Sequence, residues 1–180
     1  RFSTIKALEK IIETNQINNF ATVVYGPGWN KGVIGIVASR LTETYYKPTL
    51  VFTDGNNGEM VASARSVADF DVHNALDKCS DLFLRFGGHP AAAGLSMEKD
   101  QFEMFKTKFE KVVSQNIKER QKTPSLQIDA GIKLEDLNDH FFSCHKKLAT
   151  FGTGNMNPIL GLENLRMKGF IKFSGKDCIH

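Results

Sequence analysis

Two adjacent glycines and a histidine, Gly87, Gly88 and His89, form the part of this 180-residue sequence best suited to bind a phosphate. Glycine tolerates a positive φ and lets the backbone approach a ligand closely. Successive N–H groups in a turn can enclose an anion, and the imidazole adds a donor, or a positive charge when protonated. Small residues follow at 91–94. The segment therefore indicates a phosphate subsite; the alternative is a tight turn with a surface histidine.

Arg65 is a second candidate phosphate ligand, because it lies at the end of a predicted strand beside the hydroxyl of Ser66. A guanidinium group can bind two oxygens of one phosphate. This interpretation requires Arg65 to face the Gly-Gly-His segment. Otherwise, we expect a surface arginine paired with Asp69 or Asp71.

A third candidate lies at residues 29–32, where a predicted helix begins. A helix N-terminus attracts anions. Lys31 adds positive charge there, and Trp29 offers an aromatic face on which a base can stack. The alternative is a tryptophan in the core, followed by Asn30 as the helix cap.

The remaining reactive side chains do not form a recognisable catalytic centre. His140, Cys144 and His145 fall on one predicted helix, but histidines five residues apart do not share a face as i, i+4 ligands do. The glycine-containing segment 152–155 lacks the strand–helix setting of a dinucleotide-binding loop. Since no nucleophile has a neighbouring base, we expect no catalytic residue, metal site or cofactor in this chain.

The elements that must position these candidates alternate along the chain. Hydrophobic periodicity and turn residues predict helices over 3–17, 32–46, 71–82, 99–121 and 134–149, and strands over 21–25, 49–53, 60–66, 95–97, 126–132 and, as a pair, 159–173. Such alternation predicts an α/β domain with a mixed β-sheet flanked by helices. We expect four segments: the end of a connecting helix (1–17), the phosphate-binding domain (18–132), a helical connector and turn (133–157), and the start of a β-type domain (158–180).

Composition places the chain among ordinary globular proteins, with 41% hydrophobic and 24% charged residues. No apolar run reaches the ~18–20 residues that span a bilayer. The net charge of +3 is compatible with a polyanionic partner. Three widely spaced cysteines predict free thiols in a reducing compartment, hence the cytoplasm. The start lacks both an initiator methionine and a signal peptide, so we expect a piece of a longer protein.

Three stretches, 28–41, 63–95 and 151–158, together resemble the RecJ family of single-stranded-DNA-specific exonucleases, within the DHH superfamily. The resemblance covers nearly the whole chain and implies a DHHA1 domain followed by the start of an OB-fold domain. It implies a protein that degrades single-stranded DNA from the 5′ end in recombination and repair. Hydrolysis would require Mn²⁺ or Mg²⁺ in a DHH domain that this chain lacks, so we expect the fragment alone to be inactive.

The same resemblance implies roles for individual residues. Gly87, Gly88 and His89 would contact the phosphate of the nucleotide being cut, and Arg65 and Ser66 would bind phosphate near the 5′ end. The family commonly has histidine and proline where this chain has Asn30 and Met156.

Several expectations about partners and alternatives accompany this resemblance. Single-stranded DNA is the expected ligand and a single-strand-binding protein a candidate partner. We expect a monomer, although unpaired strand edges after Pro158 would also allow a dimer. Two alternatives stay open: a DHHA1 module of an oligonucleotide or nucleotide phosphoesterase, and a nucleic-acid-binding module without enzymatic activity.

Overall fold

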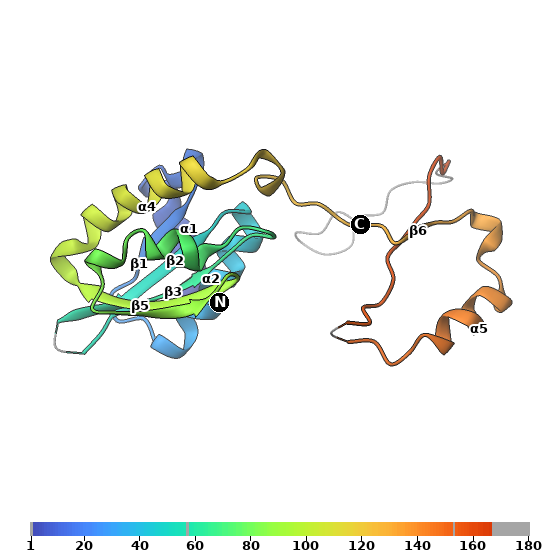
Figure 1. The fold of residues 1–180 in the computed structure, drawn as a ribbon, viewed down its shortest axis with the longest axis horizontal. Helices are drawn as coiled ribbons and strands as arrows, with labels where there is room; N and C mark the ends of the chain where they lie inside the picture. The colour runs from blue at the N-terminus through green and yellow to red at the C-terminus, as the bar shows by residue number, and fades with distance from the viewer. Residues whose placement is uncertain (1, 57, 153, 167–180) are drawn as a thin grey trace. The chain divides into compact units, whose positions relative to one another are not determined.

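The computed structural model describes residues 2–56, 58–152 and 154–166 (Figure 1), and the chain divides into two compact units after Pro124. The described helices and strands of the first unit are α1 (Phe2–Glu13), β1 (Thr22–Tyr25), α2 (Lys31–Tyr45), β2 (Thr49–Asp54), β3 (Glu59–Arg65), α3 (Val72–Asp77), β4 (Arg85–His89), β5 (Ala92–Glu98) and α4 (Phe102–Asn116). Short 3-10 turns occur between several of them.

The five strands of the first unit form one mixed sheet in the order β1-β2-β3-β5-β4. β1 and β2 are parallel, and the other neighbours are antiparallel. Figure 1 shows α4 lying along one face of this sheet. The predicted fold class, a mixed β-sheet flanked by helices, is confirmed.

One face of the sheet is packed over its full width. Phe52 on β2, Met60 on β3 and Leu95 on β5 are buried in a core that includes residues of α3 and α4. Phe105 and Phe109 of α4 have no exposed surface, and their rings stack at 5.5 Å between centroids. This core fixes β4 and β5 because their alternate side chains point into it.

The opposite face is covered only in part. Val24, Ile34, Leu41 and Val51 belong to a second cluster, in which α1 and α2 pack on β1 and β2. α2 also contacts β3. Neither helix reaches β5 and β4 with a core residue, so this half of the face is left for polar residues and glycines.

Side-chain caps fix the starts of α2 and α3. The Asn30 side chain accepts a hydrogen bond from the Gly32 N–H at 2.8 Å, and Asp71 accepts one from Asn74 at 2.9 Å. Such caps satisfy N–H groups that have no partner within the helix. α3 and α4 are both shorter than predicted. The predicted helix 99–121 ends at Asn116 because Ile117 turns to an extended conformation and packs against the core.

The second unit contains β6 (Ala130–Gly131), α5 (Asp139–Lys147) and β7 (Leu160–Gly161), with β6 and β7 parallel. The predicted strand 126–132 thus shrinks to two residues, since its apolar side chains Leu126 and Ile128 are exposed and no core holds them. The expected pair of strands at 159–173 is described only as far as residue 166. Within the described ranges, no helix combines the length and apolarity needed to cross a bilayer.

Candidate nucleic-acid interface

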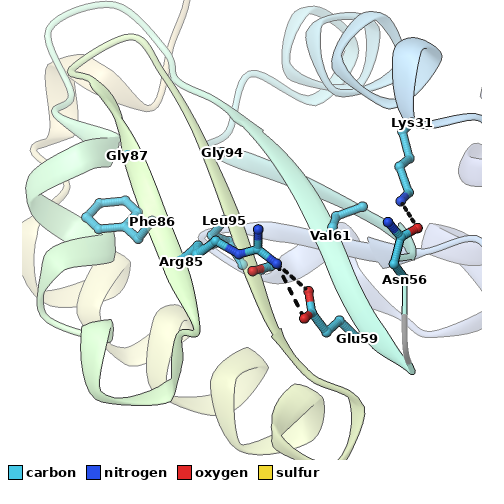
Figure 2. A pocket seen from close by; sticks show the side chains of 10 residues that line it. Lys31, Asn56, Glu59, Val61, Arg85, Phe86, Gly87, Gly94 and Leu95 are labelled. Carbon is cyan, nitrogen blue, oxygen red and sulfur yellow. Dashed lines mark hydrogen bonds and ion pairs between the residues drawn. The ribbon is translucent and has the colours of Figure 1, made fainter.

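A shallow groove of about 380 Å³ runs over the uncovered half of the sheet face (Figure 2). Strand register defines its rows. Arg65, Ala92 and His89 are neighbours across β3, β5 and β4; Ser63, Gly94 and Gly87 form the next row, and Val61, Ser96 and Arg85 the third. The groove occupies the second and third rows, with Lys31, Asn56 and Glu59 at its margin. Residues from distant parts of the sequence therefore share one surface.

The floor of the groove is bare backbone at Gly87 and Gly94, which are partners in the β4–β5 register. A Cβ atom at Gly87 would have no heavy atom within 4 Å, and one at Gly94 would lie 3.8 Å from the nearest atom. Neither glycine is required by a neighbouring side chain. Their effect is to let a ligand approach the backbone between two charged rows.

The interpretation of Gly87–Gly88 as a turn is wrong, because both residues belong to edge strand β4. The turn lies one step later, at Pro90–Ala91. Gly88 has φ +156°, and a Cβ there would lie 2.5 Å from the Ala92 carbonyl oxygen. Glycine is therefore required at Gly88 by the hairpin, whereas Gly87 is free to serve the surface.

Strand β4 does not form the predicted nest of backbone donors. Its residues pair in register with β5, from Arg85 opposite Ser96 to His89 opposite Ala92. Because Pro90 has no N–H, the terminal pair of His89 and Ala92 is of the hydrogen-bonded kind, so the His89 N–H points to β5 and those of Gly87 and Arg85 share its direction. The donors that this strand offers to a ligand on the groove side are therefore the side chains of Arg85 and His89.

Arg65 lies on the same face and in the same row as His89, as the phosphate interpretation requires. Two strand spacings separate the two backbones by roughly 10 Å. Its Nη1 donates to Ser63 Oγ at 2.9 Å and to the Ala64 carbonyl at 2.7 Å. Gly35 of α2 permits this placement, because a Cβ there would be 2.9 Å from Arg65 Nη2.

Neither acid considered as a partner binds Arg65. Asp69 pairs with Arg120 at 3.8 Å, and Asp71 caps α3. Among the described residues, Arg65 has no carboxylate within ion-pairing distance. Its charge is therefore available to an external anion.

His89 is exposed at the end of β4. Its Nδ1 accepts a long hydrogen bond of 3.4 Å from the Ala91 N–H. With Nδ1 as acceptor, the ring proton lies on Nε2, which can act as a donor. The following turn is held from two sides, since the Pro90 carbonyl accepts from Val72 N–H and the Ala91 carbonyl from Ser66 N–H, each at 3.0 Å.

Ser66 is placed differently from Arg65. Its hydroxyl donates to the Phe70 carbonyl at 2.6 Å, and its N–H holds the hairpin turn. Both of its donors are committed within the fold. As placed, Ser66 positions the loop after β3 and has no free donor for a phosphate.

Trp29 and Lys31, at the start of α2, are placed differently from each other. The Trp29 ring packs over Gly26, where a Cβ would collide with it at 1.9 Å, and joins the partly buried side chains of the α1–α2 cluster. This matches the alternative of a core tryptophan with Asn30 as cap. Lys31 instead reaches the groove margin, and its Nζ donates to Asn56 Oδ1 at 3.0 Å.

Asp54 holds the turn before α2. Its carboxylate accepts from the Tyr25 hydroxyl at 2.5 Å and from the Gly28 N–H at 2.8 Å. The hydrogen bond from Tyr25, followed by that from Gly28, holds the pKa of Asp54 below its usual range. An ionised Asp54 therefore fixes residues 26–28 and, with them, the start of the helix that carries Lys31.

The described residues include no group of three or more His, Cys, Asp or Glu side chains placed to hold a metal ion. His140 and Cys144 come within 3.7 Å of each other on α5 without a third ligand. The donor set of this part of the chain does not fit a Mn²⁺ or Mg²⁺ site.

Sequence reasoning missed three residues of this face: Ser63, Arg85 and Ser96. The signal was present in the two-residue spacing, because Arg85 precedes Gly87 and Ser63 precedes Arg65 by two positions. Once Gly87 is placed in a strand, Arg85 must share its face. Ser96 follows only from the β4–β5 register.

A sequence model of the DHHA1 domain matches residues 18–115. The chain is 32% identical over 162 residues to the single-stranded-DNA-specific exonuclease RecJ of Bacillus subtilis, which covers 89% of this chain and 20% of that protein. It is 38% identical over 96 residues to RecJ of Escherichia coli, covering 51% of this chain and 17% of that protein.

Solved structures give the same picture. RecJ from Thermus thermophilus in complex with Mn²⁺ superimposes with a TM-score of 0.69 at 26% identity, covering 89% of this chain and 24% of that one. The Mg²⁺ complex gives 0.67 at 27% identity, covering 85% of this chain and 24% of that one. The chain thus spans about a fifth to a quarter of the length of the RecJ proteins that it matches over most of its own length.

Proposed function

Because this chain belongs to the DHHA1 domain family, we propose that it is the substrate-holding part of a 5′→3′ single-stranded-DNA exonuclease that acts in DNA recombination and repair. The likeness to RecJ extends well beyond residues 18–115, since 162 residues align with the Bacillus subtilis protein. A DHHA1 module of a small-substrate phosphoesterase would not require likeness in the second unit. That observation favours the exonuclease over the two alternatives.

The proposal is supported by the residues on the uncovered half of the sheet face. Arg65 supplies a charge without a carboxylate partner among the described residues, and His89 supplies an imidazole in the same row. Between them and Arg85 lies the bare floor at Gly87 and Gly94. A single strand needs this combination, because its phosphates require positive charge and its backbone requires close approach.

Each residue has a distinct part in holding the DNA. The Arg65 guanidinium, kept in place by Ser63 and by the space at Gly35, binds a phosphate near the 5′ end. His89 Nε2 binds the phosphate to be cut, and the bare backbone at Gly87 lets that phosphate come close. Gly88 keeps the hairpin in shape, Ser66 holds its turn, and Lys31 extends the positive charge along the margin.

Bond cleavage itself belongs to another part of the protein. The RecJ structures that this chain matches hold Mn²⁺ or Mg²⁺, and this chain's described residues do not fit such a site. We place the metal in a DHH domain outside this sequence, where it would activate water for phosphodiester hydrolysis. Alone, the chain binds but does not cut, works as a monomer in the cytoplasm, and can meet a single-strand-binding protein on its DNA.

The test is binding of the purified chain to a 5′-phosphorylated, fluorescently labelled single strand, followed by anisotropy at increasing salt. We expect weak binding that salt reduces, because phosphate contacts release counterions. Duplex DNA is the competitor control and should bind more weakly. His89→Ala should weaken binding several-fold while leaving the thermal unfolding midpoint unchanged, because His89 is exposed.

A matched control for His89 is His145→Ala on α5, in the other unit. It removes the same side chain from a residue that does not line the groove and should leave affinity unchanged. Equal losses for the two variants, or no binding of single strands even at low salt, would contradict the assignment of this face.

A further inference from the structure

The third row of the open face contains an ion pair that crosses a strand. Arg85 on β4 reaches over β5 to Glu59 on β3, with Nη2 at 3.2 Å and 3.4 Å from the two carboxylate oxygens (Figure 2). One nitrogen makes both contacts, so the bidentate fork geometry is absent. The Arg85 side chain is 78% exposed. The Glu59 side chain is only 18% exposed, but the exposed guanidinium keeps the strength of this pair modest, so Arg85 can exchange Glu59 for another anion.

Ser96 lies beneath this pair. It is the register partner of Arg85 on β5, it is only 5% exposed, and it lines the groove. Its Oγ is fully buried and has no hydrogen-bond partner among the described residues. Buried hydroxyls usually have a partner, because leaving one without costs free energy. A free donor here, in a groove beside an exchangeable arginine, points to an oxyanion ligand.

We infer that Arg85 and Ser96 form a second phosphate subsite, which takes a backbone phosphodiester of single-stranded DNA further along the strand. This inference rests on the proposed function and adds to it. His89 and Arg85 are four residues apart on one strand, a distance of roughly 13 Å. The bare floor at Gly87 and Gly94 connects them. A bound strand thus reaches Arg85 only after passing the first subsite.

Binding at this subsite exchanges partners without any covalent step. The Arg85 guanidinium leaves Glu59 and binds the phosphodiester, and the Ser96 hydroxyl, uncovered by that movement, donates to the same anion. Lys31, whose Nζ is held by neutral Asn56 at the opposite margin, adds positive charge to the groove. Glu59 acts as a competitor for Arg85, so it lowers affinity for DNA.

The test measures anisotropy of the full chain with a 5′-phosphorylated thymidine oligonucleotide of about ten nucleotides and, in competition, with a 5′-phosphorylated dinucleotide. Arg85→Gln should weaken the longer strand about fivefold and leave the dinucleotide unchanged. For Arg85→Gln, the slope of log affinity against log salt concentration should become shallower by about 0.7, the value of one single-strand phosphate contact. Arg40→Gln is the matched control, since Arg40 is also an exposed arginine paired with a glutamate, at 3.0 Å from Glu43 on α2.

Two further variants separate this role from a structural one. Glu59→Gln should tighten binding of the longer strand, because it frees Arg85; a structural ion pair predicts no gain. Ser96→Ala should weaken binding and leave the fold as stable or more stable, because it removes an unpartnered buried hydroxyl. Thermal unfolding of each variant verifies folding, and Glu59→Gln tests the inference even where Arg85→Gln fails to fold.

The outcomes distinguish the two proposals. If His89→Ala and Arg65→Ala weaken binding while Arg85→Gln, Glu59→Gln and Ser96→Ala do not change it, the second subsite is wrong and the proposed function stands. If the unmodified chain binds no single strand at low salt, both are wrong. If Arg85→Gln weakens the dinucleotide and the longer strand equally, Arg85 belongs to the first subsite and the inference is wrong.

Discussion

The two faces of strands β4 and β5 are made from alternate residues of the same segments and have opposite characters. On one face Phe86, Leu95 and Met97 pack into the core with α3 and α4. On the other, Gly87, Gly94 and Ser96 line a groove. Backbone geometry is shared, so the difference comes from what covers each face: α4 runs along the first, whereas on the second α2 reaches only as far as β3. A period of two residues thus lets one strand provide stability and a binding surface independently.

The largest effect is expected on the packed face. Phe105→Ala should lower the free energy of unfolding by about 3–5 kcal/mol, because Phe105 has no exposed surface and contacts three other aromatic rings. Urea denaturation followed by circular dichroism measures the change. Met104→Ala, next to it and 59% exposed, should stay within about 0.5 kcal/mol of the unmodified chain. A loss below 1 kcal/mol for Phe105→Ala would show that the two faces differ less than their burial suggests.

The two adjacent glycines offer a sharper version of the comparison. Gly88→Ala should destabilise the fold by about 1–3 kcal/mol, because it combines a strained φ of +156° with a methyl group 2.5 Å from Ala92 O. Gly87→Ala meets no atom within 4 Å and should leave stability nearly unchanged. Gly87→Leu should instead block the groove and weaken binding of single strands. Equal thermal midpoints for Gly88→Ala and Gly87→Ala would contradict this division of roles.

Gly35 provides the next test, because it lies on α2 directly beside the guanidinium of Arg65 on the open face. Gly35→Ala should keep or raise stability, since alanine favours a helix by up to about 1 kcal/mol over glycine, yet it should weaken DNA binding a few-fold by displacing Arg65. Combined with Arg65→Ala, it should cause no further loss. Additive losses in this double-mutant cycle would show that Gly35 acts by another route.

The smallest expected effect is a loss of stability at high pH that comes from a cysteine on the packed face. Burial raises the pKa of the Cys79 thiol from an ordinary 9.0 to about 11. Since the folded state holds the proton more tightly, the contribution of Cys79 to stability is intact below about pH 9 and declines as the pH rises through the folded pKa. Cys79→Ala should reduce this alkaline loss in urea titrations at pH 8 and pH 10.

Thiol labelling gives a control for the same residue. In a Cys178→Ser background, exposed Cys144 should react at once with a disulfide reagent, and Cys79 only as the protein unfolds. Rapid labelling of both thiols in the folded protein would contradict the burial on which the pH effect depends.

Local sequence rules predicted most of the sheet, and their failures have physical causes. β3 alternates buried and half-buried residues along Glu59–Arg65, as a strand with one face in the core should. Asn30 and Asp71 mark helix starts because each side chain caps the N–H groups that follow. The paired glycines were wrongly predicted to form a turn, since glycine usually interrupts a strand. Here its neighbours Phe86 and Ala93 supply the packing that holds β4 to the sheet.

The candidate site was predicted less completely than the fold. Arg65 and His89 could be chosen by chemical type, and register then brought them into one row. Ser96 could not be predicted from the sequence. A serine in a strand becomes a candidate ligand only when the register places an arginine opposite it and its hydroxyl lacks a hydrogen-bond partner. Ser66 shows the reverse case: its type suits a phosphate, but its donors are used within the fold.

The hairpin turn at Pro90–Ala91, held by the amides of Val72 and Ser66, has a mechanical consequence. A nucleic-acid strand drawn over the open face would exert a force along β4 toward or away from that turn. Because the turn is tied both to α3 and to the loop after β3, the load passes into these two segments as well as into β5. The edge strand can therefore resist a pull without sliding against β5, even though one of its sides is unpaired.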